Sequence, residues 1–257
     1  MNNIKYLQYR ICQLASDAGE GHVPSALSIL DIVWVIYDKF INIKKVKKSL
    51  PNREHFILSK GHASLAQYVV LEKKGIIKKK LDTYLSYNSD FGGHPDSNKV
   101  KGIEASTGSL GHGMPIAAGI AYAKKLKKIK SKVYCIVGDG ECNEGTIWET
   151  CLIASNYKLN NFICIVDKNK SSDRAIKIDD IKKKFLSFNW NVVTVDGHNH
   201  KNLIKIFKKK SSKPLAIIAN TIKGKGVKFM EHNQHEWHHK KIDNLVLKKI
   251  KNEIFNK

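Results

Sequence analysis

Two apolar runs of equal length, Val133–Val137 and Phe162–Val166, constrain the fold of this chain more than any other feature. Each run is rich in β-branched residues and stops abruptly at polar residues, which is typical of a strand buried in a parallel sheet. A helical pattern lies between them. Because a helix between two buried strands makes them parallel neighbours, we predict an α/β fold with a doubly wound, mostly parallel sheet and helices on both faces.

Both predicted strands deliver polar groups to one edge of the sheet. The first ends in Gly138-Asp139-Gly140-Glu141 and the second leads to Asn169. Open α/β sheets bind their ligands at the carboxyl ends of the strands. A carboxylate with an amide or backbone oxygen suits Mg²⁺ or Ca²⁺ bridging a diphosphate, and the glycines let the main chain approach closely. A helix expected to begin near Cys142 points its N-terminus at the same region, which favours anions.

The spacing of these residues resembles a family signature. Gly138-Asp139-Gly140, then 28 residues (141–168), then Asn169 is similar to the thiamine diphosphate and magnesium motif, and 138–145 with Trp148-Glu149 resembles its transketolase version. Gly-Asp-Gly alone is more often a plain turn, but the spacing and the two strands favour the signature. The resemblance implies a thiamine-diphosphate-binding fold and a metal site formed by Asp139, Asn169 and the carbonyl of Ser171.

Other segments resemble transketolases in the order of that family. Four of them carry histidines: Gly21-His22, Ser59-Lys-Gly-His62, Gly92-Gly-His94-Pro95 and Trp237-His238. Taken singly, each histidine is as easily an ordinary turn residue. The resemblance implies that His22, His62, His94 and His238 contact substrate and relay protons, for which a near-neutral pKa is suited. Departures from the family pattern are Val23-Pro24-Ser25, Ser109 and His112.

The resemblance also implies which residues contact the cofactor. Glu144, in Asn-Glu-Gly, matches a family glutamate that reaches across a subunit interface towards the partner's catalytic glutamate, and it is included with the four histidines as catalytic. Asp196-Gly-His198 also matches, and we expect His198 near the site in a structural role. The implied cofactor contacts are His62, Gly108, Ser109, Leu110, Gly138, Asp139, Gly140, Glu141 and Asn169.

The net charge of +22 raises the alternative of a nucleic-acid-binding protein. The only arginines are Arg10, Arg53 and Arg174, and the lysine runs are scattered without interleaved aromatic residues. We therefore expect no nucleic acid partner, and a field that favours anionic sugar phosphates. Four histidines between 232 and 239 suggest a metal cluster, but no cysteine or second distant pair completes a zinc site.

The length and the cysteines bear on the domain organisation and the compartment. We expect residues 1–257 to form one domain, with no membrane span and no signal peptide, because no apolar run approaches about 20 residues. Five cysteines, none in a Cys-x-x-Cys pair, indicate a reducing cytoplasm.

A complete transketolase continues into a pyrimidine-binding domain that supplies the glutamate activating the cofactor, and no residues remain here to build it. The resemblance therefore implies the N-terminal half of a split transketolase, inactive alone and completed by a C-terminal subunit in an α₂β₂ assembly. With thiamine diphosphate and Mg²⁺, or Ca²⁺ or Mn²⁺ as substitutes, the pair would transfer a two-carbon ketol unit from a ketose phosphate to an aldose, as in the pentose phosphate pathway. Three alternatives stay open: part of an unusual-sugar synthase, part of a 2-oxoacid decarboxylating enzyme, and a non-catalytic remnant.

Overall fold

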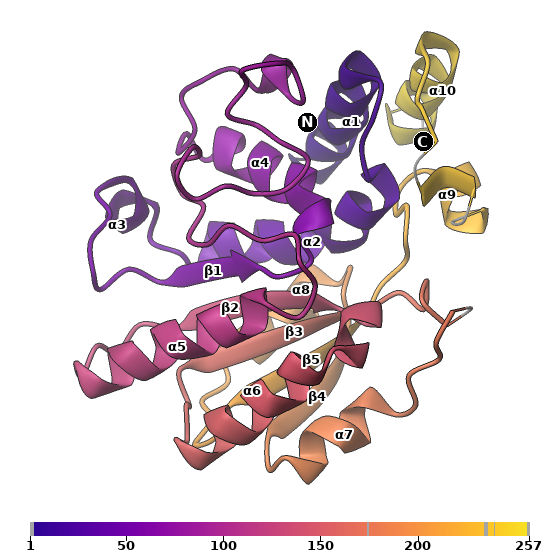
Figure 1. The fold of residues 1–257 in the computed structure, drawn as a ribbon. Helices are drawn as coiled ribbons and strands as arrows, with labels where there is room; N and C mark the ends of the chain where they lie inside the picture. Colours follow the sequence, from indigo (N-terminus) through magenta and orange to yellow (C-terminus); the bar gives the residue numbers. More distant parts are fainter. Residues whose placement is uncertain (1–2, 174, 234–235, 239, 256–257) are drawn as a thin grey trace.

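A five-stranded, wholly parallel sheet forms the centre of the molecule (Figure 1). The computed structural model describes residues 3–173, 175–233, 236–238 and 240–255. The spatial order is β1-β2-β3-β5-β4, which confirms the predicted α/β class. The strands are β1 (His55–Leu58), β2 (Val133–Gly138), β3 (Phe162–Lys168), β4 (Asn191–Asp196) and β5 (Leu215–Asn220).

Helices cover both faces of this sheet, as predicted (Figure 1). One face packs against α2 (Val23–Lys39) and α8 (His200–Phe207). The same core extends outward to α1 (Asn3–Ala18) and α4 (Ser64–Lys73), which pack on α2, and to α10 (Asn244–Phe255), which packs on α1. The other face packs against α5 (Gly113–Leu126), α6 (Gly145–Asn156) and α7 (Ile181–Ser187). Two short helices, α3 (Ile43–Lys47) and α9 (Lys228–His232), complete the α-helices of the described ranges.

The alternation of side chains along the strands separates two hydrophobic cores. On β2, Tyr134 and Ile136 belong to the core under α1, α2 and α4, whereas Cys135 and Val137 belong to the core under α5, α6 and α7. Successive strand residues point to opposite faces, so a strand covered on both faces must be apolar throughout. Helix α2 is buried from Val23 to Tyr37, and its nearly continuous apolar sequence is typical of a helix enclosed on all sides.

The predicted helix start near Cys142 is wrong by a few residues, and polar side chains set where this helix and α7 begin. The segment after Asp139 first forms a 3₁₀ turn, Gly140–Asn143, because the Asp139 carboxylate accepts the N–H of Gly140 (2.8 Å); α6 starts only at Gly145. Helix α7 begins at Ile181, because Asp180 caps it by accepting the N–H of Lys183 (3.1 Å).

All five cysteines are buried and unpaired. Within the described ranges, no helix combines the length and the apolar character needed to cross a lipid bilayer.

Candidate functional site

The carboxyl ends of β2 and β3 meet as the sequence predicted. Gly138 pairs with Asp167 in register, and the N–H of Asp139 donates to the carbonyl oxygen of Asp167 (3.2 Å). The Asp139 carboxylate accepts the main-chain N–H of Lys170, and the Asn169 side-chain oxygen accepts that of Ser171 (3.0 Å). The turn after β3 is therefore folded around the two side chains proposed as metal ligands.

These groups line a cavity of about 240 Å³ at the edge of the sheet. Nine of its lining residues were predicted from the sequence: His62, Leu110, Gly138, Asp139, Gly140, Glu141, Asn169, Ser171 and His238. Sequence reasoning missed the other four, Ser25, Lys60, Ser172 and Lys223. The cavity thus combines the acidic strand end at 138–141 with residues from six other parts of the chain.

Asp139 is only 4% exposed, and its surroundings oppose its negative charge. Burial raises the pKa of this carboxyl, and the nearby Asp167 raises it further, although the N–H groups of Lys170 and Gly140 act in the opposite sense. A bound divalent cation would relieve this cost. One carboxylate, one amide oxygen and one carbonyl are the hard oxygen donors that Mg²⁺ prefers, so the residues present fit the predicted ion.

The main chain also leaves room for a ligand close to this carboxylate. A Cβ on Gly140 would come within 2.9 Å of the Ser172 Cβ, so only glycine allows the two turns to approach so closely. Across the described ranges, no three His, Cys, Asp or Glu side chains surround a common metal position. The predicted site does not need such a group, because it draws on one carboxylate only.

A fully buried carboxylate that the sequence analysis overlooked, Asp167, organises the floor of the site. It forms an ion pair with Lys60 and accepts hydrogen bonds from Ser28 (2.7 Å), Asn169 (3.0 Å) and Thr221. These partners come from α2, the β1–α4 turn, the end of β3 and the end of β5. The signal available in the sequence was an aspartate placed inside an otherwise apolar strand, which needs buried partners.

The four predicted histidines converge, although they are far apart in the chain. The ring of His22 lies 5.3 Å from that of His62, 5.6 Å from that of His238 and 6.5 Å from that of His94, between centroids. His22 precedes α2, His62 follows β1, His94 belongs to the loop before α5, and His238 ends the 3₁₀ turn Glu236–His238. His235 and His239, which belonged to the rejected metal cluster, lie outside the described residues.

The prediction of a near-neutral pKa for all four histidines is wrong for His62. Burial, together with the positive charge of Lys60 and smaller effects of His22, His238 and Lys223, lowers the pKa of His62 to about 2. Its imidazole is therefore neutral throughout the physiological range. It can donate or accept a hydrogen bond, but in the free protein it does not carry a positive charge.

Lys223 is a second cation of the cavity and is 3% exposed. Its ammonium group donates to Nδ1 of His238 (2.6 Å). Burial and the nearby Lys60 lower the pKa of Lys223 to about 8, while Asp167 and Asp139 partly offset them. The loop Asn220–Gly226 stands out in the sequence for its glycines, but nothing there distinguishes this lysine from the many others.

The loop between residues 107 and 113 lies against His94 and Ser59. A Cβ on Gly108 would stand 3.2 Å from the His94 ring, and one on Gly113 would stand 2.6 Å from Cα of Ser59. Leu110 lines the cavity and is 36% exposed, whereas Ser109 contacts His112 (3.3 Å) and is absent from the cavity wall. The predicted contact of Ser109 with the cofactor would therefore have to be made by its main-chain atoms.

The two predicted glutamates differ in their surroundings. Glu141 is 1% exposed, and its carboxylate accepts from Ser59 and from the N–H groups of Gly111 (2.8 Å) and Gly138 (3.0 Å). It therefore joins three segments of the cavity wall. Glu144 is exposed at the start of α6, beside Gly111, where a second chain can reach it.

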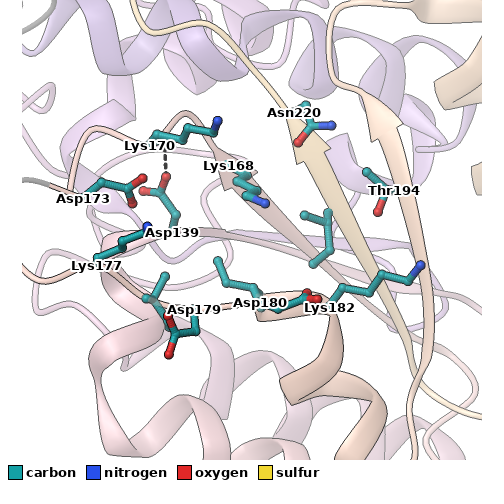
Figure 2. Close-up of a pocket in the computed structure, with 13 residues that line it drawn as sticks. Asp139, Lys168, Lys170, Asp173, Lys177, Asp179, Asp180, Lys182, Thr194 and Asn220 are labelled. Atoms are coloured by element: carbon teal, nitrogen blue, oxygen red, sulfur yellow. Dashed lines mark hydrogen bonds between the residues drawn. The ribbon is translucent and has the colours of Figure 1, made fainter.

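A larger cavity of about 600 Å³ is also lined by Asp139 and is shown in Figure 2. Lysines and aspartates from the end of β3 to the start of α7 line it. Thr194 of β4 and Asn220 of β5 complete this part of its wall. None of the four histidines belongs to its wall. The smaller cavity is the candidate active site, because it joins the predicted metal ligands to His62 and His238.

The parallel α/β fold and this cavity match the thiamine-diphosphate-binding class that the sequence predicted, and comparison with known families agrees with that class. The chain belongs to the family described as "Transketolase, thiamine diphosphate binding domain", whose profile matches residues 2–254. Among solved structures, transketolase from Campylobacter jejuni matches with a TM-score of 0.85 and 31% identity over 98% of this chain and 42% of that one.

Two curated relatives are more specific, and each is named as one subunit of apulose-4-phosphate transketolase. The relative from Actinobacillus succinogenes is 37% identical, covering 93% of this chain and 91% of the relative. The relative from Phocaeicola vulgatus is 34% identical, covering 90% of this chain and 84% of the relative. The chain therefore has about the extent of these separate subunits and less than half that of the Campylobacter transketolase.

Proposed function

We propose that this chain is the diphosphate-binding subunit of a split transketolase that uses thiamine diphosphate and Mg²⁺. The main observation behind this proposal is that the strand ends bearing Asp139 and Asn169 share one cavity with His62 and His238. The rings of these two histidines also lie next to that of His22. Asp139, Asn169 and the Ser171 carbonyl would hold the metal ion. The buried cation of Lys223 supports a role for this cavity in binding a diphosphate.

The reaction is transfer of a two-carbon ketol unit from a ketose phosphate to an aldose. The bond between carbons 2 and 3 of the donor breaks, and the hydroxyl on carbon 3 loses its proton as carbon 3 becomes a carbonyl group. A new carbon–carbon bond then forms at the acceptor aldehyde, whose oxygen gains a proton. The transfer is redox-neutral, and thiamine diphosphate, when bound, supplies the means of carrying the two-carbon unit between the two sugars.

The histidine cluster is placed to handle these hydroxyls and protons. Because His62 stays neutral, we assign it to hydrogen bonding of a sugar hydroxyl or cofactor oxygen, and assign proton relay to His22, His94 and His238. Glu144 is proposed to contact a partner's catalytic glutamate. Its exposure beside Gly111, which follows the cavity-lining Leu110, supports this role.

A second polypeptide is part of the proposal, and the surface of α5 and α6 is where we expect it to bind. These helices lie side by side (Figure 1) and carry a concentration of exposed large apolar side chains. Leu110 connects this surface to the cavity, because it lines the cavity and is itself partly exposed. We call this surface the α5–α6 face and define it by six exposed large apolar residues, four on the helices and two just outside them: Ile116, Leu126, Leu152 and Ile153, with Leu110 and Tyr157.

Exposed apolar groups on this scale mark interaction surfaces. We propose that the face binds a C-terminal, pyrimidine-binding transketolase subunit in an α₂β₂ assembly, and that residues 1–257 act as one domain. The naming of the two relatives as subunits supports a second chain. The five unpaired, buried cysteines support a reducing cytoplasm as the location.

The test is reconstitution. We would purify the chain together with a C-terminal transketolase subunit and measure ketol transfer with thiamine diphosphate and Mg²⁺, each chain alone serving as the control. Apulose 4-phosphate, named for the relatives, is the first donor, and a 2-oxoacid is the competing substrate. Activity of the pair with a ketose phosphate supports the proposal. Decarboxylation of the 2-oxoacid, or cofactor binding with no turnover of any sugar, would replace it with one of the alternatives.

A further inference from the structure

The turn between β4 and α8 contacts the loop that carries Lys223. The N–H of Gly197 donates to the carbonyl oxygen of Asn220 (2.8 Å), and a Cβ on Gly197 would overlap the methyl group of Thr221. Only glycine permits this approach. The following residue, His198, is held in place because its N–H donates to the Asp196 carboxylate (2.8 Å). The two segments are therefore docked closely at Gly197.

The ring of His198 makes two hydrogen bonds that together define its tautomer. Nδ1 lies 2.8 Å from the carboxylate of Asp31, which only accepts, so this nitrogen carries the proton. Nε2 accepts the main-chain N–H of Ile222 (2.9 Å). A neutral imidazole with its proton on Nδ1 satisfies both contacts, whereas the other tautomer and the doubly protonated ring each lose at least one of them.

Asp31 is well placed to hold this ring. It projects from the buried helix α2, is 6% exposed, and accepts a second hydrogen bond from Nε2 of His200 (2.6 Å). Burial alone would raise its pKa, but the hydrogen bonds that His198 and His200 donate outweigh this and lower the pKa of Asp31. The buried, ionised carboxylate of Asp31 therefore anchors a chain of two hydrogen bonds, which runs from Asp31 through the His198 ring to the N–H of Ile222.

We infer that His198 is a positioning residue that, held by Asp31, fixes the Ile222 peptide and thereby sets the ammonium group of Lys223 in the cavity. Lys223 directly follows Ile222 in the chain, so the position of one peptide governs the other. The expected consequence, a change in affinity for the diphosphate of the cofactor, rests on the proposed function. The hydrogen-bond series itself does not depend on any ligand.

His200 provides a matched control, because it also bonds Asp31 but makes no hydrogen bond to the Lys223 loop in the described structure. In His198→Asn, the amide nitrogen reaches Asp31 but nothing accepts from Ile222. In His198→Gln, the longer side chain carries an acceptor to the place of Nε2. We expect His198→Asn to weaken thiamine diphosphate binding about tenfold, since one main-chain N–H loses its partner, and His200→Asn to change it less than about twofold. His198→Gln should recover most of the loss.

Two measurements in the free protein make the test independent of cofactor binding. Nitrogen-15 chemical shifts of the His198 ring should show a neutral form protonated on Nδ1, and exchange of the Ile222 amide should be faster in His198→Asn than in His200→Asn at similar thermal stability. A ring protonated on Nε2, or equal loss of affinity in the two asparagine variants, would overturn the inference. If the wild-type chain shows the Nδ1-protonated ring but binds no thiamine diphosphate, the proposed function fails while the positioning contact stands.

Discussion

The main-chain N–H of Asp139 donates to the carbonyl oxygen of Asp167, so two buried carboxylates stand at adjacent strand ends. They have different surroundings. Asp167 is paired with Lys60 and surrounded by hydroxyl and amide donors, whereas Asp139 accepts mainly from main-chain N–H groups and has no ion pair among the described residues. The protein itself therefore neutralises Asp167, whereas Asp139 remains available to bind a cation.

Removing the charge of Asp139 should therefore abolish metal-dependent cofactor binding. We expect Asp139→Asn to weaken binding of thiamine diphosphate with Mg²⁺ by about 100-fold or more, because charge-assisted ligation is lost. Isothermal titration calorimetry measures this directly. Asp173→Asn, in the larger cavity of Figure 2, is the control and should bind within about twofold of wild type. Equal losses in the two variants would contradict the assignment of the metal site.

Cofactor affinity should fall as pH rises through about 8. Below the pKa of Lys223, about 8, its ammonium is charged in the free protein and can pair with a diphosphate at no protonation cost. Above it, binding must be accompanied by proton uptake, so affinity decreases by up to tenfold per pH unit. Lys223→Met should bind more weakly at about pH 7 and show a flatter profile. Lys182→Met is the control, and a profile unchanged by Lys223→Met would refute this role.

The ion pair between Lys60 and Asp167 should matter for stability. Lys60 is 2% exposed and Asp167 is fully buried, so Lys60→Met leaves a carboxylate without its counter-charge. We expect a loss of about 3–5 kcal/mol in the free energy of unfolding, measured by urea denaturation. The double variant Lys60→Met/Asp167→Asn should be less destabilised than Lys60→Met alone. A single variant as stable as wild type would show that the hydrogen bonds of Asp167 suffice.

Two glycines of α5 should respond oppositely to alanine. A Cβ on Gly113 would stand 2.6 Å from Cα of Ser59, whereas one on Gly119 would meet nothing within 4 Å. Gly113→Ala should destabilise the protein by about 1–3 kcal/mol through overpacking, and Gly119→Ala should stabilise it by about 0.5–1 kcal/mol through helix propensity. Thermal denaturation distinguishes them, and the same sign of change in both would contradict the described packing.

The α5–α6 face should be needed for assembly with the C-terminal chain. Leu152→Asp and Ile153→Asp place charges on side chains that are already exposed, so folding should be little affected. Each should weaken the affinity for the C-terminal subunit, measured by titration calorimetry, by about 100-fold if the residue lies at the centre of the interface. Leu245→Asp, on α10, is a matched exposed control. Wild-type assembly by both α6 variants would place the interface elsewhere.

Much of the site was predictable because local sequence encodes it. A parallel strand must be apolar throughout when both faces are covered, so Val133–Val137 and Phe162–Val166 were recognisable as strands, and the polar residues that end them had to meet at one edge. The four histidines were found through short motifs, each within one turn. The same reasoning missed Lys60, Asp167 and Lys223, because a charged residue shows its function only by its buried partners.

The sequence by itself determined the parallel sheet, the positions of β2 and β3, and the aspartate and asparagine at the ends of these strands, since these depend on side-chain periodicity and turn residues within short segments. Only the tertiary structure decided the convergence of the histidines on His22, the neutrality of His62 and the bond from His198 to the Lys223 loop. These depend on desolvation and on contacts between residues far apart in the chain, and neither quantity is a property of a local pattern.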